Sequence, residues 1–352
     1  MDILLTIPGA ILDQLQKPTL AFLIAGVLLA AAGSRFEIPQ PVYKFIVILL
    51  LLKVGIGAGL SIQEADLMAL AVPALGATFI GIAVVVLGSQ TLARLSGVSR
   101  TDALATVGLF GAVSASTLAA GMIMLDEQGM AYEGFIGALY PFMDIAALVT
   151  AITLAKLSVA RAQSRASFAG GGTVVLGGGS GPTPGEETGG LIKGILVDTL
   201  RSPAISALLA GLGLGLFAEP ASVYDSFYDP LFRGLLSLLM LIMGMEAWAR
   251  LSELRKVAHV YVLYGLAAPF VHGLIGFGIG LVAHEWTGFS AGGVVLLAVM
   301  AASSSDISGP PTMRAALPEA NPSAYVGTST GLGTPVAILS IPLWIALAGW
   351  WI

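Results

Sequence analysis

Ten long apolar stretches, separated by short charged or Pro/Gly-rich segments, run through almost the whole chain. A helix needs about 20 mostly apolar residues to cross a bilayer, and runs of that length recur here. Only 11% of the 352 residues are charged, whereas soluble domains carry about a quarter. So few charges cannot cover a globular surface, which excludes a soluble enzyme and a disordered protein. The pattern predicts an all-α polytopic membrane protein with ten transmembrane helices.

The expected spans lie between charges or Pro/Gly punctuation. They cover approximately residues 18–34, 42–60, 69–93, 101–123, 133–157, 203–218, 230–250, 257–283, 289–309 and 322–350. The chain has no Cys, so it has neither disulfides nor Cys-ligated zinc, and its formal net charge of -5 argues against a nucleic-acid partner.

The distribution of Lys and Arg predicts the orientation, because basic residues concentrate on the cytoplasmic side of membrane proteins. Ten spans place both termini on the same side. If that side is extracytoplasmic, 13 of the 16 Lys and Arg residues lie at the cytoplasmic face, and only Lys17, Lys53 and Arg233 do not. We therefore expect a plasma (inner) membrane protein with both termini outside.

One long polar segment, 158–202, divides the chain into halves of five spans each. Its Gly/Pro/Ser-rich middle predicts a flexible cytoplasmic linker between a first repeat, 1–157, and a second repeat, 203–352. The motif at 18–26, Pro-x-Leu-x-x-Leu-x-Ala-Gly, resembles the one at 203–211, and Ala131-Tyr132 resembles Ala324-Tyr325. An odd number of spans per half makes the halves opposite in orientation. The sequence thus predicts two inverted five-helix repeats, an arrangement typical of secondary transporters.

The fourth span of each half is interrupted by small hydroxyl residues. These stretches are 108–117 (GLFGAVSAST) and 301–311 (AASSSDISGPP), and offsets of 190 and 193 residues align them about equally well. Pro310 and Pro311 lack N–H groups and disfavour helix before them. We expect broken helices 4 and 9 that cross near the bilayer midplane, because irregular backbone at that depth survives only in protein or beside a cavity.

Each break starts a second half-helix, whose N-terminal N–H groups and positive dipole end favour an anion. The hydroxyls that accompany the breaks belong to Ser114, Ser116, Thr117, Ser304, Ser305 and Ser308. Any single one of them can instead bond an i−4 carbonyl within its own helix.

Two carboxylates lie within spans, Asp306 in the second break and Asp144 in span 5. The counterpart of Asp144 in span 10 is near Thr334-Pro335, so both fifth spans carry a Pro beside a polar residue. A carboxylate at that depth is a functional candidate, and oxygen ligands without His or Cys suit Na⁺. Proton coupling, or for Asp144 a structural bond to a broken helix, are the alternatives.

Three other features have simpler interpretations. Glu246 is either a gate or an end residue that snorkels, and His272 is a helix-packing residue rather than a ligand. Small-xxx-small pairs at 55/59, 211/215 and 276/280 predict close helix contacts.

Several runs resemble the cyanobacterial sodium-dependent bicarbonate transporter family, SbtA. They are DALATVGLFGAVSAST (102–117), GALYPFMDIAALVTAI (137–152), VYDSFYDPLFRGLLSLLMLIMGMEAWARLSELRKVA (223–258) and AASSSDISGPPT (301–312). The resemblance implies a high-affinity Na⁺/bicarbonate symporter of a CO2-concentrating mechanism, working by alternating access. It also implies a homotrimer, gate (scaffold) and core domains each built from both repeats, and a PII-like regulatory protein, SbtB, at the cytoplasmic face.

The family pattern implies ion sites between the two breaks. Bicarbonate would be held by Gly111, Ala112, Val113, Ser114, Ser116, Thr117, Ser304 and Ser305. Sodium, the co-transported ion, would be held by Ser114, Ser116, Asp144, Asp306 and Ser308. No other cofactor is expected.

Three alternative functions remain open from the sequence. A carrier of another small anion, such as a short carboxylate, would usually need an Arg, and no Arg lies in mid-span. An intramembrane enzyme would need a Ser/His or HExxH constellation, which is absent. An ion channel can use broken helices with carboxylates, but an inverted repeat favours a carrier.

Overall fold

The structure, a computed structural model, is built from helices. It describes residues 18–36, 38–64, 67–169, 193–194, 197, 200–254 and 259–352, and no strand occurs in these ranges. Seven helical segments are long and apolar enough to cross a membrane: 40–63, 68–94, 100–128, 134–159, 221–249, 259–287 and 322–351. Three further apolar helices, 18–31, 203–217 and 291–302, are shorter. The all-α polytopic architecture is confirmed, and each expected span overlaps one of these helices.

The helices follow one another in simple order. They are α2 (Pro18–Ala31), α3 (Gln40–Glu64), α4 (Leu67–Gln90), η1 (Leu92–Arg94), α5 (Arg100–Gly111), α6 (Ala115–Gln128), η2 (Gly134–Leu139), α7 (Tyr140–Ala169), α9 (Pro203–Phe217), α10 (Ala221–Val223), η3 (Tyr224–Tyr228), α11 (Asp229–Leu254), α12 (His259–Thr287), α13 (Ala291–Ala302), α14 (Gly309–Ala316), α15 (Pro322–Thr328), η4 (Ser329–Gly333) and α16 (Thr334–Trp351). The fifth expected span of each half contains an irregular stretch. The 3₁₀ stretch η2 precedes α7, and the π-helical turn η4 lies between α15 and α16.

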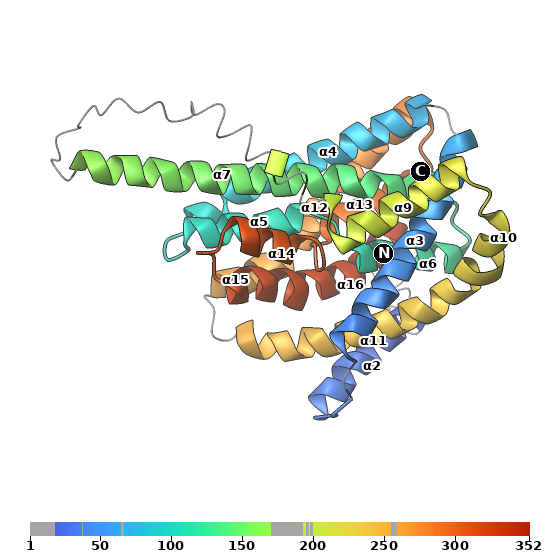
Figure 1. Ribbon diagram of the computed structural model, residues 1–352, viewed down its shortest axis with the longest axis horizontal. Coiled ribbons are helices and arrows are strands. Elements are labelled where there is room, and N and C mark those ends of the chain that lie inside the picture. Colours follow the sequence, from blue (N-terminus) through green and yellow to red (C-terminus); the bar gives the residue numbers. More distant parts are fainter. Residues whose placement is uncertain are drawn as a thin grey trace, which may run out of the picture.

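Four helices form two close pairs, α3 with α9 and α2 with α11 (Figure 1). Glycines allow the backbones to touch. A Cβ on Gly55 would lie 3.1 Å from the Cα of Gly211, and a Cβ on Gly59 would lie 2.7 Å from the Cα of Gly215. Gly26 meets α11 in the same way. The close contacts predicted from the small-xxx-small pairs are confirmed here.

The remaining long helices pack around the two interrupted spans. α4 and α5 both pack on α7, and α12 and α16 both pack on α13. The expected contact at 276/280 is confirmed too, since a Cβ on Gly276 would lie 2.6 Å from the Cβ of Ala301. As a result α5, α6 and α13 have almost no solvent-exposed side chains.

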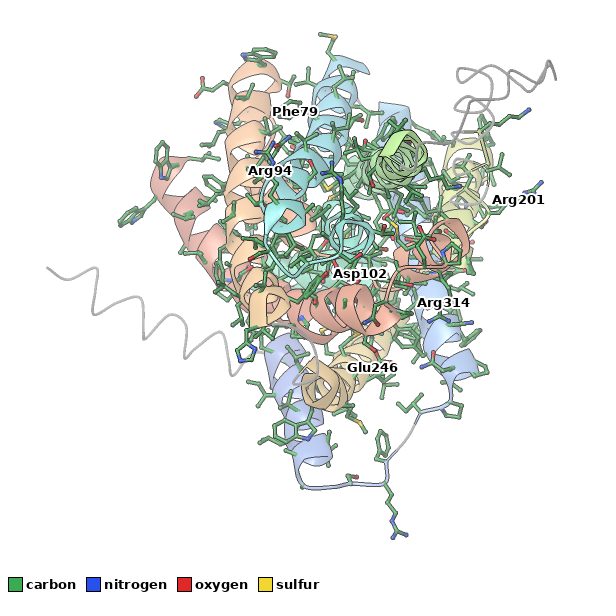
Figure 2. The ribbon with its side chains drawn as sticks, turned by 90° about the vertical axis from the view of Figure 1, so that its left-hand side faces the viewer. Phe79, Arg94, Asp102, Arg201, Glu246 and Arg314 are labelled. Carbon is green, nitrogen blue, oxygen red and sulfur yellow. The ribbon has the colours of Figure 1, made fainter. Side chains whose placement is uncertain are left out.

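Carboxylates connect the two halves of the chain at helix starts. Glu133, before η2, accepts hydrogen bonds from the backbone N–H and the hydroxyl of Ser290, at 2.6 and 2.9 Å, where α13 begins. Asp102, in α5, accepts from the N–H of Asn321 at 2.8 Å, where α15 begins. Figure 2 shows Asp102 at the end of the molecule that faces the viewer. Both bonds therefore hold a helix start of the second half against the first half.

α7 differs from the sequence-based expectation at its C-terminal end. The linker was expected from residue 158, but the helix continues to Ala169 and extends beyond the other helices (Figure 1). The physical reason is that residues 158–169, SVARAQSRASFA, contain neither Gly nor Pro and are rich in residues that favour helix. The Gly-rich part of the linker, 170–192, lies outside the described residues.

Candidate functional site

The first break is short and ends in a capped half-helix. α5 ends at Gly111, the backbone at Ala112 and Ser114 is extended, and α6 begins at Ala115. The Ser114 hydroxyl accepts from the N–H of Thr117 at 3.2 Å. Because the first residues of a helix have no intrahelical acceptor, the N–H groups of Ala115 and Ser116 are left as donors at this end.

The second break is longer and offers fewer donors. α13 ends at Ala302 and α14 begins at Gly309, so six residues, 303–308, separate them against three in the first break. The N–H of Gly309 donates to the Ser305 hydroxyl at 2.9 Å, and Pro310 and Pro311, which follow, have no N–H. We expected an anion-binding helix N-terminus at both breaks. The N-terminus of α6 fits this expectation better than that of α14, which offers fewer N–H donors.

The two breaks are hydrogen-bonded to each other. The N–H of Ser114 donates to the Ser303 hydroxyl at 3.0 Å, across 189 residues of sequence. The N–H of Ser305 donates to the carbonyl of Leu109, at the end of α5, at 2.8 Å. The two breaks therefore meet in the structure, although Ser303 and Leu109 lie just outside the predicted ranges 304–308 and 111–117.

A chain of polar side chains leads from the start of α6 to Asp306. The Ser114 and Ser116 hydroxyls are 2.8 Å apart, and Ser116 donates to Asp306 Oδ2 at 2.9 Å. Ser114 and Ser116 are fully buried, while Asp306 is half-buried. A carboxylate therefore lies beside the free N–H groups of α6, where its negative charge opposes a bound anion unless a cation neutralises it.

A second network surrounds Asp144, which is fully buried. Its Oδ1 accepts from the N–H of Val113 at 3.1 Å, and its Oδ2 accepts from the Ser308 hydroxyl at 3.1 Å. Ser308 and Ser305 share a hydrogen bond of 3.0 Å. Asp144 therefore makes the structural bond that was one of its two interpretations, and it does so to both breaks at once.

Ser304 lies differently from the other predicted residues. Its hydroxyl contacts the Ser329 carbonyl and the Thr334 hydroxyl, both at 3.1 Å, and so faces η4 and α16 rather than α6. Ser303, which meets α6, was missed by the sequence analysis because all three serines of the run 303–305 look alike. Thr334 was noticed only as the counterpart of Asp144.

Fixed positive charge is absent from both networks, as far as the described residues extend. Lys53 is buried but its Nζ lies 3.2 Å from Asp229 Oδ1 and 4.3 Å from the centre of the Phe232 ring. His272 packs between the rings of Phe110 and Tyr264, in keeping with a packing role. The site consists of hydroxyls, backbone groups and two carboxylates.

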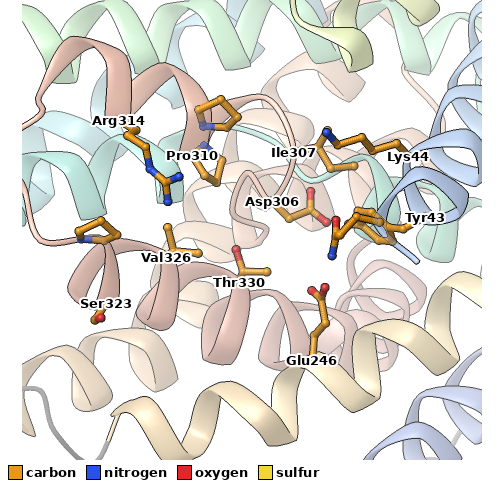
Figure 3. A pocket seen from close by; sticks show the side chains of 13 residues that line it. Tyr43, Lys44, Glu246, Asp306, Ile307, Pro310, Arg314, Ser323, Val326 and Thr330 are labelled. Atoms are coloured by element: carbon orange, nitrogen blue, oxygen red, sulfur yellow. The ribbon is translucent and has the colours of Figure 1, made fainter. Parts of the chain in front are cut away.

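A cavity of about 300 Å³ opens beside the second break (Figure 3). Asp306 and Thr330 line it from one side, Glu246 of α11 from another, and Lys44 and Arg314 also contribute. Lys44 and Arg314 belong to the basic face that the Lys/Arg distribution assigns to the cytoplasm. The cavity therefore joins that face to the carboxylate of the second break.

A comparison with protein families agrees with this geometry. The family model of the Na⁺-dependent bicarbonate transporter superfamily matches residues 18–349. The chain belongs to this superfamily. The match spans both breaks, both carboxylates and the cavity, and confirms the resemblance seen in the sequence. A search of curated proteins gave no match.

Membership of this superfamily makes the chain a multi-pass transporter whose ions are bicarbonate and Na⁺. Transport, rather than intramembrane catalysis, is the function that such a family performs. The polar networks of the two breaks are then the candidate ion site.

Proposed function

We propose that the protein is a high-affinity Na⁺/bicarbonate symporter that works by alternating access and supplies inorganic carbon to a CO2-concentrating mechanism. The observation that carries this proposal is the hydrogen bond from Ser116 to Asp306, which links the donor-rich start of α6 to a carboxylate. Bicarbonate is a compact oxyanion that the N–H groups of Ala115 and Ser116 suit. Na⁺ is held by Asp306, Asp144 and the hydroxyls of Ser116 and Ser308, whereas the Ser114 hydroxyl, which caps α6, serves the anion.

Two further observations support ten spans in inverted repeats. The first expected span of each half packs on the second span of the other half, as α2 on α11 and α3 on α9. The fourth spans are both broken, and the fifth spans each contain an irregular turn, η2 or η4, shortly before Pro141 or Pro335. The close pairs α2/α11 and α3/α9 form the gate or scaffold domain, and the helices around the breaks form the core domain.

The direct test is uptake of labelled bicarbonate by cells or proteoliposomes that contain the protein, with Na⁺ replaced by K⁺ or choline. We expect uptake to require Na⁺, and short carboxylates such as formate to compete weakly. Unchanged uptake without Na⁺ would remove the symport mechanism. Strong competition by a short carboxylate would favour a carrier of that anion instead.

Alternating access is supported by the difference between the two ends of α3. In its C-terminal half, η2 packs so closely that a Cβ on Gly134 would lie 2.7 Å from Ser61 Cβ, and Gly137 contacts Val54. Near its start, Tyr43 and Lys44 line the open cavity. One side is sealed while the other is open, as expected for a carrier facing the cytoplasm.

A disulfide across the seal tests this mechanism, because the chain has no native Cys. We expect Val54→Cys/Gly137→Cys to lose uptake on oxidation and regain it with a reductant, while each single variant is insensitive to oxidant. Uptake that continues through the crosslinked protein would show that η2 and α3 need not separate.

The remaining parts of the proposal concern its setting. In this proposal the protein is an inner-membrane homotrimer with both termini extracytoplasmic, and a PII-like regulatory protein binds its cytoplasmic face. An impermeant thiol reagent should fail to label Ser180→Cys from outside intact cells. Labelling from outside would reverse the orientation, and the mass of the purified protein in detergent tests the trimer.

A further inference from the structure

The two oxygens of the Asp306 carboxylate have different surroundings. Oδ2 accepts the hydrogen bond from Ser116, whereas Oδ1 is buried without a hydrogen-bond partner. A buried, unpaired acceptor is costly, and in native structures it usually marks a missing ligand or water. Asp306 is also one of the residues that line the 300 Å³ cavity.

A second unpaired oxygen faces the same cavity. The Thr330 side chain is 3% exposed, and its hydroxyl has no partner. Thr330 lies in the π-helical turn η4, where the wider turn places its side chain on the cavity wall. π-Helical turns inside longer helices occur frequently at functional sites.

A third element completes the set. Glu246 reaches the cavity from α11, in the helix group opposite the breaks. Figure 3 shows the carboxylates of Glu246 and Asp306 and the Thr330 hydroxyl around a common space. Two carboxylates that line the same cavity repel each other, and a cation between them removes the repulsion.

We propose that Asp306 Oδ1, the Thr330 hydroxyl and the Glu246 carboxylate form a separate cation station through which Na⁺ leaves for the cytoplasm. Oxygen ligands of this kind suit a small hard cation, and the cavity has room for water to complete the coordination. Asp306 belongs both to the buried polar network at the breaks and to the cavity. Na⁺ can therefore move from the network to the cavity while it stays bound to the same carboxylate. The station rests on the Na⁺-coupled transport proposed above.

The station is tested by measuring Na⁺ dependence from each side of the membrane. Bicarbonate transport is followed in right-side-out and inside-out vesicles over a series of Na⁺ concentrations, with ²²Na⁺ release as a second measurement. Glu246→Gln should raise the half-saturating Na⁺ concentration on the cytoplasmic side about tenfold or more, because it removes a charged ligand. Dependence on external Na⁺ should stay within about twofold of the native protein.

Thr330 supplies an independent variant that preserves shape. Thr330→Val should shift the cytoplasmic Na⁺ dependence in the same direction, and Thr330→Ser, which keeps the hydroxyl, should restore it. Asp225→Asn, an exposed carboxylate on η3, is the matched control and should change neither side.

Two results would overturn the station. One is an unchanged cytoplasmic Na⁺ dependence in both Glu246→Gln and Thr330→Val, and the other is an equal shift on both sides. Either result leaves the symport intact if native uptake still requires Na⁺. Native uptake that is independent of Na⁺ would instead remove the proposed function itself.

Discussion

The two breaks occupy equivalent places in the two halves of the chain, yet they present opposite chemistry. The first, 112–114, carries no charge and opens α6 with free N–H groups. The second, 303–308, carries Asp306 and opens α14 with two prolines that have no N–H. The difference shows that the first break offers backbone donors and the second offers side-chain oxygens, so we expect the first to serve mainly the anion and the second mainly the cation.

The hydrogen bonds across the breaks explain how the two halves act together. Ser116 donates to Asp306, and Asp144 accepts from both Val113 and Ser308. A cation bound to the carboxylates therefore changes the electrostatic potential at the N-terminus of α6, which is hydrogen-bonded to Asp306 through the Ser116 side chain. Binding of the two ions should be coupled through this contact.

The largest effect is expected from the carboxylates. Asp306→Asn and Asp144→Asn should abolish uptake or raise the Na⁺ requirement by roughly 10- to 150-fold, because contacts to a charged group contribute about 1.5–3 kcal/mol. The Na⁺ dependence of bicarbonate uptake, at matched abundance in the membrane, is the measurement. If both variants retain the native Na⁺ dependence, the assignment of the cation to these carboxylates is wrong.

Coupling between the breaks should appear as a reciprocal effect. Saturating Na⁺ should lower the apparent Kd for bicarbonate, and saturating bicarbonate should lower that for Na⁺ by the same factor, roughly 5- to 150-fold. Equilibrium binding to purified protein measures both. Independent binding of the two ions would show that the two halves of the site do not communicate.

A hydroxyl of the first break should affect the anion more than the cation. Ser114→Ala removes the cap of α6 and the contact to Ser116, and should weaken bicarbonate binding about tenfold or more. The Na⁺ affinity without bicarbonate should change less. An effect confined to Na⁺ would reverse the division of roles.

Ser304→Ala should weaken bicarbonate binding less, although the family resemblance places Ser304 among the residues that hold the anion. Since its hydroxyl faces Ser329 and Thr334, the loss should be less than about tenfold and smaller than for Ser114→Ala. Direct comparison of the two variants in one binding assay decides the ranking. A larger loss for Ser304→Ala would place its hydroxyl on the anion.

The smallest effect is expected from restoring donors to the second break. Pro310→Ala/Pro311→Ala adds two N–H groups at the start of α14, near Asp306. A helix end contributes about 0.3–1 kcal/mol to a nearby charge, so the apparent Na⁺ affinity should fall roughly two- to fivefold. Tighter Na⁺ binding would mean that the missing donors do not matter to the cation.

The positions of the two breaks explain why the sequence left the residue offset between the two halves ambiguous. Two offsets, 190 and 193 residues, fitted the halves equally well. The second break contains three more residues than the first, so the helices before the breaks and those after them differ in offset by three residues. An insertion inside a break leaves no helical periodicity to mark it, so the sequence could not place it.

The sequence by itself determined the membrane-protein class, the interrupted fourth spans and the two carboxylates that lie within spans. These follow from apolar run length, from Pro and Gly, and from the rarity of buried charge, all of which act locally. Only the tertiary structure decided that Ser303 rather than Ser304 meets α6, that Asp144 bonds to both breaks, and that Glu246 shares a cavity with Asp306. The physical reason is that a hydroxyl or carboxylate takes its direction from its partner. Here the partners lie in helices that are distant along the chain and meet only when the helices pack.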